Sequence, residues 1–371
     1  MDDQETLQED NQSIMDKLGA LWQVIAIPLA AVLLALVIGA ILLAVSGANP
    51  FRAYSALIEG SFGSMKAFGR TLAKATPLIF SGLAVAFAFK AGLFNIGAQG
   101  QLLFGAIASA AAGFMITGLP PFLHASLALL IGAAAGALFA AIPGALKAYT
   151  GAHEVITTIM LNYVAINLTD YFADGPLKDT TEGNIVARTP EILASARIPS
   201  IGEIPVGFFL GVLAAVIIWW LLWRTTLGFE IRTVGISPHA AKYAGMRVAQ
   251  TVILTMVISG LLAGIGGAIE TQGIVYRYQP GFNAGLGFDG ITIALLGKTH
   301  PIGIIPAAIL IGAMKAGAST MQFNAGVAKE ITDVIQALML FFVTADIIIR
   351  KLLRTKAESG EKVTLSGWGQ Q

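Results

Sequence analysis

An aromatic ring and three carboxamides stand where a long apolar segment begins: Phe94, Asn95, Gln99 and Gln101. Asn95 and Gln99 are four residues apart, so on a helix they would share one face. Carboxamides offer hydrogen-bond donors and acceptors without net charge, which suits a neutral polyhydroxyl or heterocyclic solute. The alternative interpretation is a polar helix end that is wetted by water or bonded to a neighbouring helix.

A second polar stripe lies on a later apolar segment. Glu154, Thr158 and Asn162 recur every four residues and therefore occupy one helix face. An ionisable side chain at a membrane boundary, in line with such a stripe, predicts a solute pathway. The alternative is that Glu154 only forms an ion pair with Lys147 or Lys90 at the membrane surface.

Two more charges stand within or beside apolar segments. Asp289 begins a short apolar run and could line an outer vestibule or lie at the membrane interface. Lys315 is a lone cation inside an apolar segment, with Asp333 or Asp346 as possible partners, and the sequence assigns it no function. The four histidines are far apart and cysteine is absent, so no metal site is expected.

The composition is that of a protein that crosses a membrane several times. Of the 371 residues 56% are hydrophobic and only 12% are charged, whereas soluble domains carry about 25% charged residues. The net charge of +1, without a basic patch, gives no reason to expect a nucleic-acid partner. The sequence lacks a GxxxxGK[ST] phosphate loop and any catalytic constellation, so the chain is not expected to be an enzyme or to hydrolyse ATP itself.

These polar residues must be positioned by an all-α bundle of about ten transmembrane helices. Apolar segments of suitable length predict nine of them, and the short run Ile291–Leu296 predicts a broken eighth helix. The nine are Leu21–Ser46, Thr71–Lys90, Asn95–Thr117, Phe122–Lys147, Val155–Phe172, Val206–Trp223, Val248–Gly273, Ile302–Ser319 and Ile331–Ile349.

The remaining segments predict how the chain is divided. Residues 1–19 and 351–371 are expected to be cytoplasmic, the first of them disordered, and they flank a membrane domain over 20–350. Asn49–Arg70 is expected to lie as an amphipathic piece on the outer surface, and 174–205 to form an extracellular loop where a soluble partner docks. A modest excess of Lys and Arg in the inner loops favours both termini inside.

A short sequence match predicts internal symmetry. Residues 91–97 (AGLFNIG) and 284–290 (AGLGFDG) share their pattern apart from one inserted glycine. The first would open its helix from the inside and the second from the outside. This is typical of an inverted-topology repeat, in which helices 2–5 are mirrored by helices 7–10 around a site at the membrane midplane.

A polar island between two apolar segments, 224–247, contains a short helix with marked ends. Ser237 can cap free N–H groups, Pro238 suits the first helical position, and Gly245 can end the helix. Two turns of helix are marginal alone in water, so we expect this helix to pack against something.

Three motifs resemble one family. Residues 235–246 (GISPHAAKYAGM) are similar to the G-x-N/S-P-x-A-A-x-Y-A-G-I loop of permease subunits of ATP-binding-cassette importers for ribose, other simple sugars, nucleosides and branched-chain amino acids. Residues 94–101 and 151–163 resemble signatures of the nucleoside branch. His153 stands where that branch usually has Asn, which weakens any role for this position.

The resemblance implies partners and a mechanism. In that family the loop holds a coupling helix that docks in a groove of the ATPase subunit, and the residues implied here are Gly235, Ser237, Pro238, Ala240, Ala241, Tyr243, Ala244 and Gly245. A second similar permease and a solute-binding lipoprotein complete the importer, in a bacterial cytoplasmic membrane. ATP is used by the partner, so no cofactor is expected on this chain. The alternatives are an importer for simple sugars such as ribose and an ion-coupled secondary transporter.

Overall fold

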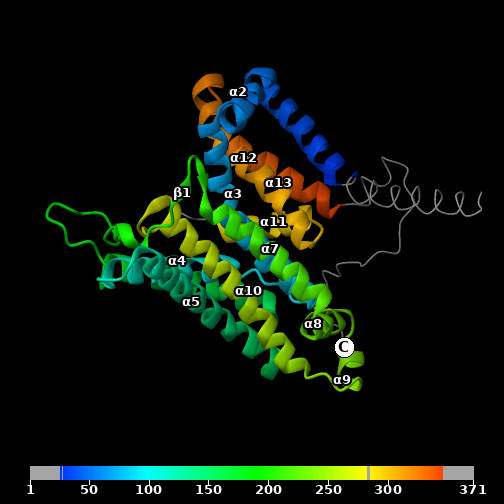
Figure 1. Cartoon of the computed structure of the whole chain (residues 1–371). Helices are drawn as coiled ribbons and strands as arrows, with labels where there is room; N and C mark the ends of the chain where they lie inside the picture. The colour runs from blue at the N-terminus through cyan, green and yellow to red at the C-terminus, as the bar shows by residue number, and fades with distance from the viewer. Residues whose placement is uncertain (1–25, 27, 282–284, 346–371) are drawn as a thin grey trace, which may run out of the picture.

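The computed structural model describes residues 26, 28–281 and 285–345, in which the regular elements are helices and one pair of two-residue antiparallel strands (Figure 1). The strands β1 and β2 pair at the end of the loop that leads directly into α7. Six helices in the described part are long and apolar enough to cross a membrane. They are Pro28–Val45, α3 (Met65–Lys90), α5 (Pro121–Thr150), α7 (Val206–Arg224), α10 (Val248–Glu270) with its π-helical continuation η2 (Thr271–Val275), and α12 (Pro301–Ala325).

The other four expected transmembrane segments are also helical. They are α4 (Ala98–Met115), α6 (Glu154–Asp174), α11 (Leu286–Leu296) and α13 (Glu330–Thr344). Shorter elements are α2 (Pro50–Phe62), η1 (Ala194–Ala196), α8 (Thr226–Ile236), α9 (Pro238–Tyr243), β1 (Ser200–Ile201) and β2 (Ile204–Pro205). The predicted tails, 1–19 and 351–371, lie outside the described residues.

The interpretation of Asn49–Arg70 as one surface piece is wrong. Its second part belongs to α3, which begins at Met65, and its first part is α2, one side of which is buried against α12. The buried side of α2 consists of small residues, so α2 and α12 approach closely. The Ser61 hydroxyl donates to the carbonyl oxygen of Ala313 at 2.6 Å. The spacing of the hydrophobic residues indicated an amphipathic helix, but it did not indicate that a neighbouring helix would cover the side that carries the small residues.

Glycines let the central helices approach to backbone contact. A Cβ atom at Gly267 of α10 would lie 2.0 Å from the carbonyl oxygen of Leu102 in α4. At Gly105 of α4 it would lie 2.3 Å from the carbonyl oxygen of Gly264 in α10. In lipid the hydrophobic effect does not drive helices together, so close packing at such crossings stabilises their association. These crossings hold α3, α4, α5, α10, α11 and α12 together as the centre of the bundle.

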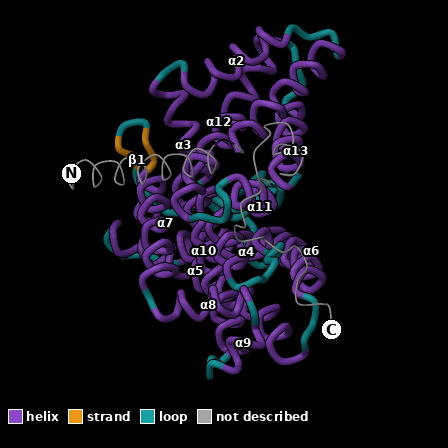
Figure 2. The backbone as a smooth tube through the Cα atoms, turned by 90° about the vertical axis from the view of Figure 1, so that its right-hand side faces the viewer, coloured by secondary structure: helices purple, strands orange, loops and turns teal. Residues whose placement is uncertain are grey.

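Two of the shorter helices begin inside the bundle instead of at its end. After α3 ends at Lys90, the chain turns back, so that Asn95 contacts Ser259 in the middle of α10 before α4 begins. The start of α11 lies against the start of α4, because the backbone N–H of Gly287 donates to Gln99 Oε1 at 2.8 Å. In Figure 2, α13, α11, α4 and α6 follow one another along one side of the molecule.

Candidate functional site at the starts of two inner helices

Asn95 is the centre of a buried hydrogen-bond network. Its Nδ2 donates to Gln101 Oε1 at 2.9 Å and to Ser259 Oγ at 2.8 Å. Its Oδ1 accepts from the backbone N–H of Gly97 at 3.0 Å and from Gln101 Nε2 at 3.1 Å. The Ser259 hydroxyl in turn donates to the carbonyl oxygen of Ala84 at 2.6 Å. Every donor and acceptor of the Asn95 amide is therefore engaged in joining α3, α4 and α10.

The expectation that Asn95 and Gln99 share a helix face is wrong. The helix α4 begins at Ala98, so Asn95 lies in the turn before it. Gln99 and Gln101 are both buried, and Gln99 reaches α11 instead of pointing along the same side as Asn95. A segment that re-enters the bundle needs these amides as caps, since the free N–H groups of an inner helix start have no water to bond.

The polar stripe of α6 lies on one buried face, as its spacing predicted. Glu154, Thr158 and Asn162 are at most 2% exposed. Asn162 caps α4 from outside: its Oδ1 accepts from the backbone N–H of Gly100 at 2.8 Å, and its Nδ2 donates to the carbonyl oxygen of Ile96 at 3.0 Å. The side chain thus supplies what Gly97 at the cap position of α4 lacks.

Glu154 forms an ion pair with Lys147, the alternative partner that the sequence suggested. Lys147 Nζ lies 2.9 Å from Glu154 Oε2, and this joins the end of α5 to the start of α6. The hydroxyl of Thr158 donates to the Glu154 carbonyl at 2.7 Å and so stays on its own helix. Phe94 is half-buried and its ring lies 4.7 Å from that of Phe89.

Asp289 in the first turn of α11 ties three helices together. Its Oδ2 lies 3.0 Å from Lys315 Nζ of α12, and its Oδ1 accepts a short hydrogen bond from Gln336 Nε2 of α13. The sequence suggested Asp333 or Asp346 for Lys315; Asp333 is exposed in the first turn of α13, and Asp346 lies outside the described residues. Position in the first helical turn favours a carboxylate at residue 289.

An exchange of Asn95 tests this capping role. Asn95→Leu is expected to destabilise the purified chain by at least about 2 kcal/mol, because Gly97 and Ser259 would keep buried polar groups without their partner. Asn167→Leu is the matched control, since the Asn167 amide is exposed and, among the described residues, donates to the Tyr163 carbonyl of its own helix. Thermal unfolding in detergent should separate the two; equal melting temperatures would contradict the assignment.

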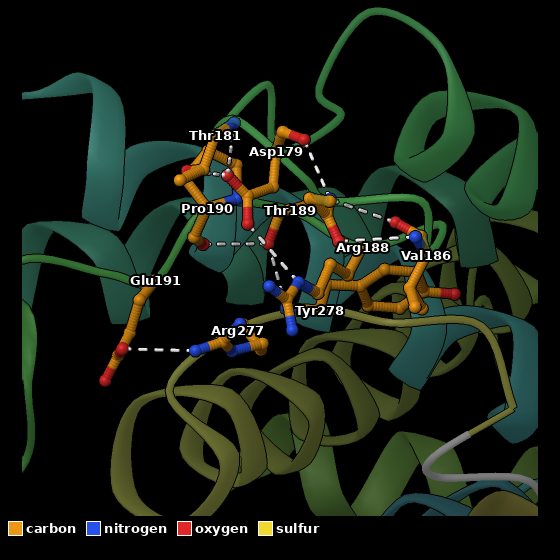
Figure 3. A network of polar contacts seen from close by, with 10 residues as sticks. Asp179, Thr181, Val186, Arg188, Thr189, Pro190, Glu191, Arg277 and Tyr278 are labelled. Carbon is orange, nitrogen blue, oxygen red and sulfur yellow. Dashed lines mark hydrogen bonds and ion pairs between the residues drawn. The ribbon is translucent and has the colours of Figure 1, made fainter.

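The long loop before α7 forms a second polar region (Figure 3). It is joined to the segment that leads into α11, because the backbone N–H groups of Thr189 and Ile192 donate to the carbonyl oxygens of Tyr278 and Tyr276 at 2.9 and 2.8 Å. Glu191 pairs with Arg197 at 2.6 Å and with Arg277 at 3.1 Å. The expected loop 174–205 is therefore ordered and includes η1 and the two strands. We refer to residues 174–205 as the cover.

Two titratable groups, one in this loop and one in the segment joined to it, have shifted pKa values. The hydroxyl and backbone N–H of Thr181, with the guanidinium of Arg188, lower the pKa of the Asp179 carboxyl. Burial raises the pKa of Tyr278 to about 12. Both groups stay in their neutral-pH forms, Asp179 as an anion and Tyr278 as a phenol, so the cover keeps its bonding pattern across the physiological range.

The polar island holds two short helices at the end of the bundle where α7 ends and α10 begins. The predicted helix is present as α9: Ser237 Oγ accepts from the Ala240 N–H at 3.3 Å, Pro238 is its first residue, and Gly245 has a φ of +83°. Tyr243 is 93% exposed, and Ala240 and Ala244 are exposed beside it. Ala241 faces inward and is fully buried.

The second helix of the island, α8, was not predicted. It runs over Thr226–Ile236 and is capped by Thr225, whose Oγ1 accepts from the Gly228 N–H at 3.1 Å. Near its end, a Cβ atom at Gly235 would lie 2.2 Å from the carbonyl oxygen of Lys90 and 3.0 Å from the nitrogen of Gly92. The helix therefore connects α9 directly to the turn that precedes Asn95.

A known family model matches residues 67–344, which include both polar regions and the island. Its description is "Branched-chain amino acid transport system / permease component". The chain belongs to this permease family. It is a multi-pass membrane subunit of an ATP-binding-cassette importer, and the permease component is the part of such a transporter that does not hydrolyse ATP.

Several curated proteins are similar to the permease over most of their length. The guanosine ABC transporter permease protein NupP of Bacillus subtilis (strain 168) is 42% identical over 90% of this chain and 97% of its own. The nucleoside ABC transporter permease protein NupB of Lactococcus lactis is 36% identical over 92% and 96%. The glucose ABC transporter permease protein TsgB13 of Haloferax volcanii is 33% identical over 89% and 90%.

The first two organisms each have a second, more distant relative of the permease. The guanosine ABC transporter permease protein NupQ of Bacillus subtilis is 30% identical over 65% of this chain and 78% of its own. The nucleoside ABC transporter permease protein NupC of Lactococcus lactis is 29% identical over 64% and 77%. Two different permease chains thus carry the same transporter description in each organism.

The sequence did not reveal the contacts of three residues of the permease. Ser259 stands in an otherwise apolar helix, and its hydroxyl bridges Asn95 to α3. Lys315 was seen but not paired with Asp289, and Gln336 was passed over. A polar residue in the middle of an apolar helix is the signal that marks each of them.

Proposed function

We propose that this permease is one of two membrane subunits of an importer for nucleosides. The observation that carries the proposal is its near full-length similarity to permeases described as guanosine and nucleoside transporters. The polar groups near the starts of the inner helices are amides, hydroxyls and ion pairs, and this composition favours an uncharged solute. The solute class is a ring with hydrogen-bonding groups and no phosphate.

The pathway is proposed to follow the side of the permease formed by α13, α11, α4 and α6 (Figure 2). Only a narrow stripe of α6 is buried, and much of its surface, including Tyr163 at 62%, is exposed. A second permease would cover this side and complete the pathway. The presence of two different permease relatives in each of two organisms supports a heterodimer.

The membrane topology that fits this proposal has ten crossings and an inverted repeat. In it, α3 to α6 are mirrored by α10 to α13. Each inner helix crosses the first helix of the other half: α4 packs on α10, and α11 packs on α3. The meeting of the α4 and α11 starts at Gln99 and Gly287 would lie near the midplane. Both termini would then be inside a bacterial cytoplasmic membrane.

The remaining partners follow from the two ends of the bundle. An ATPase subunit would dock on the exposed side of α9, which includes Ala240, Tyr243 and Ala244. A solute-binding lipoprotein would dock on the cover formed by 174–205 at the opposite end. Closure of the ATPase pair on ATP would rock the two permeases against each other and move the solute inward.

Uptake measurements test the proposal. Cells that carry the complete transporter are expected to accumulate labelled guanosine and uridine, and cells without this permease are expected to lose at least about nine-tenths of that uptake. Cells with an inactive ATPase subunit are the matched control and should lose it equally. Uptake that survives loss of the ATPase but collapses with the proton gradient would point to an ion-coupled transporter and contradict the proposal.

Simple sugars are the second candidate class, because the relative TsgB13 is described as a glucose permease. Ribose and glucose in excess should leave nucleoside uptake unchanged if the proposal is right. If instead either sugar abolishes uptake and unlabelled nucleosides do not, the substrate is a sugar and the nucleoside assignment fails.

A further inference from the structure

An ion pair in the middle of the bundle is only partly closed off. Lys315 lies near the middle of α12, and its ammonium is 3.0 Å from Asp289 in the first turn of α11. The side chain of Lys315 is 25% exposed and that of Asp289 is 14% exposed. Either charge alone would be costly to hold within apolar helices, so each requires the other.

Within this ion pair, the group that can still form a hydrogen bond to a ligand is the Lys315 ammonium, a donor. Asp289 Oδ1 accepts from Gln336, and Oδ2, which has no hydrogen-bond partner in the part of the chain that the structure describes, is buried 3.0 Å from the Lys315 ammonium, so neither oxygen is open to a ligand. An ammonium has three N–H donors, and among the described residues Lys315 has Asp289 as its ion-pair partner. Phe288, next to Asp289 in α11, is 44% exposed and offers an apolar ring at the same end of the helix.

The pair also has no net charge. An isolated lysine at this position would attract phosphate groups, whereas the Asp289 carboxylate at 3.0 Å cancels its charge over longer distances. A donor that is neutral overall discriminates in favour of uncharged solutes with carbonyl or ring-nitrogen acceptors. Nucleobases carry such acceptors on an aromatic ring.

We propose that Lys315 contacts the transported solute, donating to an acceptor on the heterocyclic ring, and that Asp289 keeps the position neutral so that phosphorylated forms are rejected. This inference rests on the proposed function, since it places the solute on the side formed by α13, α11, α4 and α6. The ion pair is then a determinant of specificity in addition to a link between helices.

The test measures displacement of labelled nucleoside from the permease–ATPase complex in lipid discs, without the binding lipoprotein. Lys315→Met is expected to weaken nucleoside affinity about tenfold, the factor for losing one hydrogen bond from a charged donor. Asp289→Asn leaves the lysine charge unbalanced, so nucleoside 5′-monophosphate should become at least about a tenfold better competitor. Asp333→Asn and Lys329→Met, which remove exposed charges at the outer end, are the controls and should change neither value.

A purely structural pair would give different results. It would lower the yield and melting temperature of both variants without changing the affinity ratio between nucleoside and monophosphate. The exchanged variant, Asp289→Lys with Lys315→Asp, would then restore affinity as well as yield, and this outcome would overturn the inference. A wild-type complex that binds no nucleoside would overturn the proposed function itself, whereas wild-type binding with unchanged variants would overturn this inference alone.

Discussion

Replacing Ala244 by glutamate is expected to reduce ATP-driven uptake at least about tenfold while the membrane helices stay folded. Ala244 is exposed at the end of α9, beside Tyr243, whose side chain is 93% exposed. A large exposed aromatic ring next to small residues is typical of the centre of an interface, where charged residues are depleted. A glutamate there would be buried without a partner in the proposed complex of α9 with the ATPase.

Uptake, ATPase co-purification and melting temperature should be measured on the same variant. The control is Ala328→Glu, the same exchange at an exposed position in the turn between α12 and α13, and it should leave all three values unchanged. Ala241→Glu is expected to behave differently from both, because Ala241 is fully buried and a charge there would disturb the island itself. Full uptake by the Ala244 variant would contradict the proposal that α9 is the coupling helix.

The second large effect is expected from Gly267→Ala, a change of one methyl group. The new Cβ atom would lie 2.0 Å from the carbonyl oxygen of Leu102, which belongs to the backbone of α4 and cannot rotate away. The two helices would have to separate, with a cost of about 1–3 kcal/mol or more for overpacking. We expect most of the protein to be lost from the membrane fraction, and the rest to unfold at a lower temperature.

The matched control for this exchange is Gly273→Ala in the continuation of the same helix. A Cβ atom at Gly273 would meet only Ile198 Cβ at 4.0 Å, which is ordinary contact. Alanine is a better helix former than glycine, so this variant should be as stable as the wild type or slightly more so. If both variants were equally stable, the close crossing of α4 and α10 would not be needed for folding.

The sequence predicted helices better where their ends are marked by local chemistry. Ser237, Pro238 and Gly245 lie within one short stretch of the chain, so the cap, first residue and end of α9 could be read from residue types alone. The short α11 was expected because its apolar run cannot span a bilayer by itself. The unpredicted α8 has a cap of the same kind at Thr225, but its Arg and Glu residues made it resemble a loop.

The roles of the polar site residues could not be read in the same way. Asn162 was recognised by its spacing, but its task depends on the N–H group of Gly100, 62 residues away in the chain. Asn95 likewise bonds Ser259 across 164 residues. The partner of each buried amide depends on how α4 re-enters the bundle. The sequence does not show this path of the chain, so it could not distinguish a helix-capping role from a role in the solute pathway.

The contact of Gly235 with the turn after α3 directly links the short helices α8 and α9 to the inner helix starts. Because α8 rests on the backbone of Lys90 and Gly92 without an intervening side chain, a displacement of α9 cannot be absorbed by a rotamer change at that point. It must shift the turn that carries Asn95, and with it the starts of α4 and α11. Under the proposed docking of an ATPase on α9, force applied there would move the backbone in the middle of the bundle.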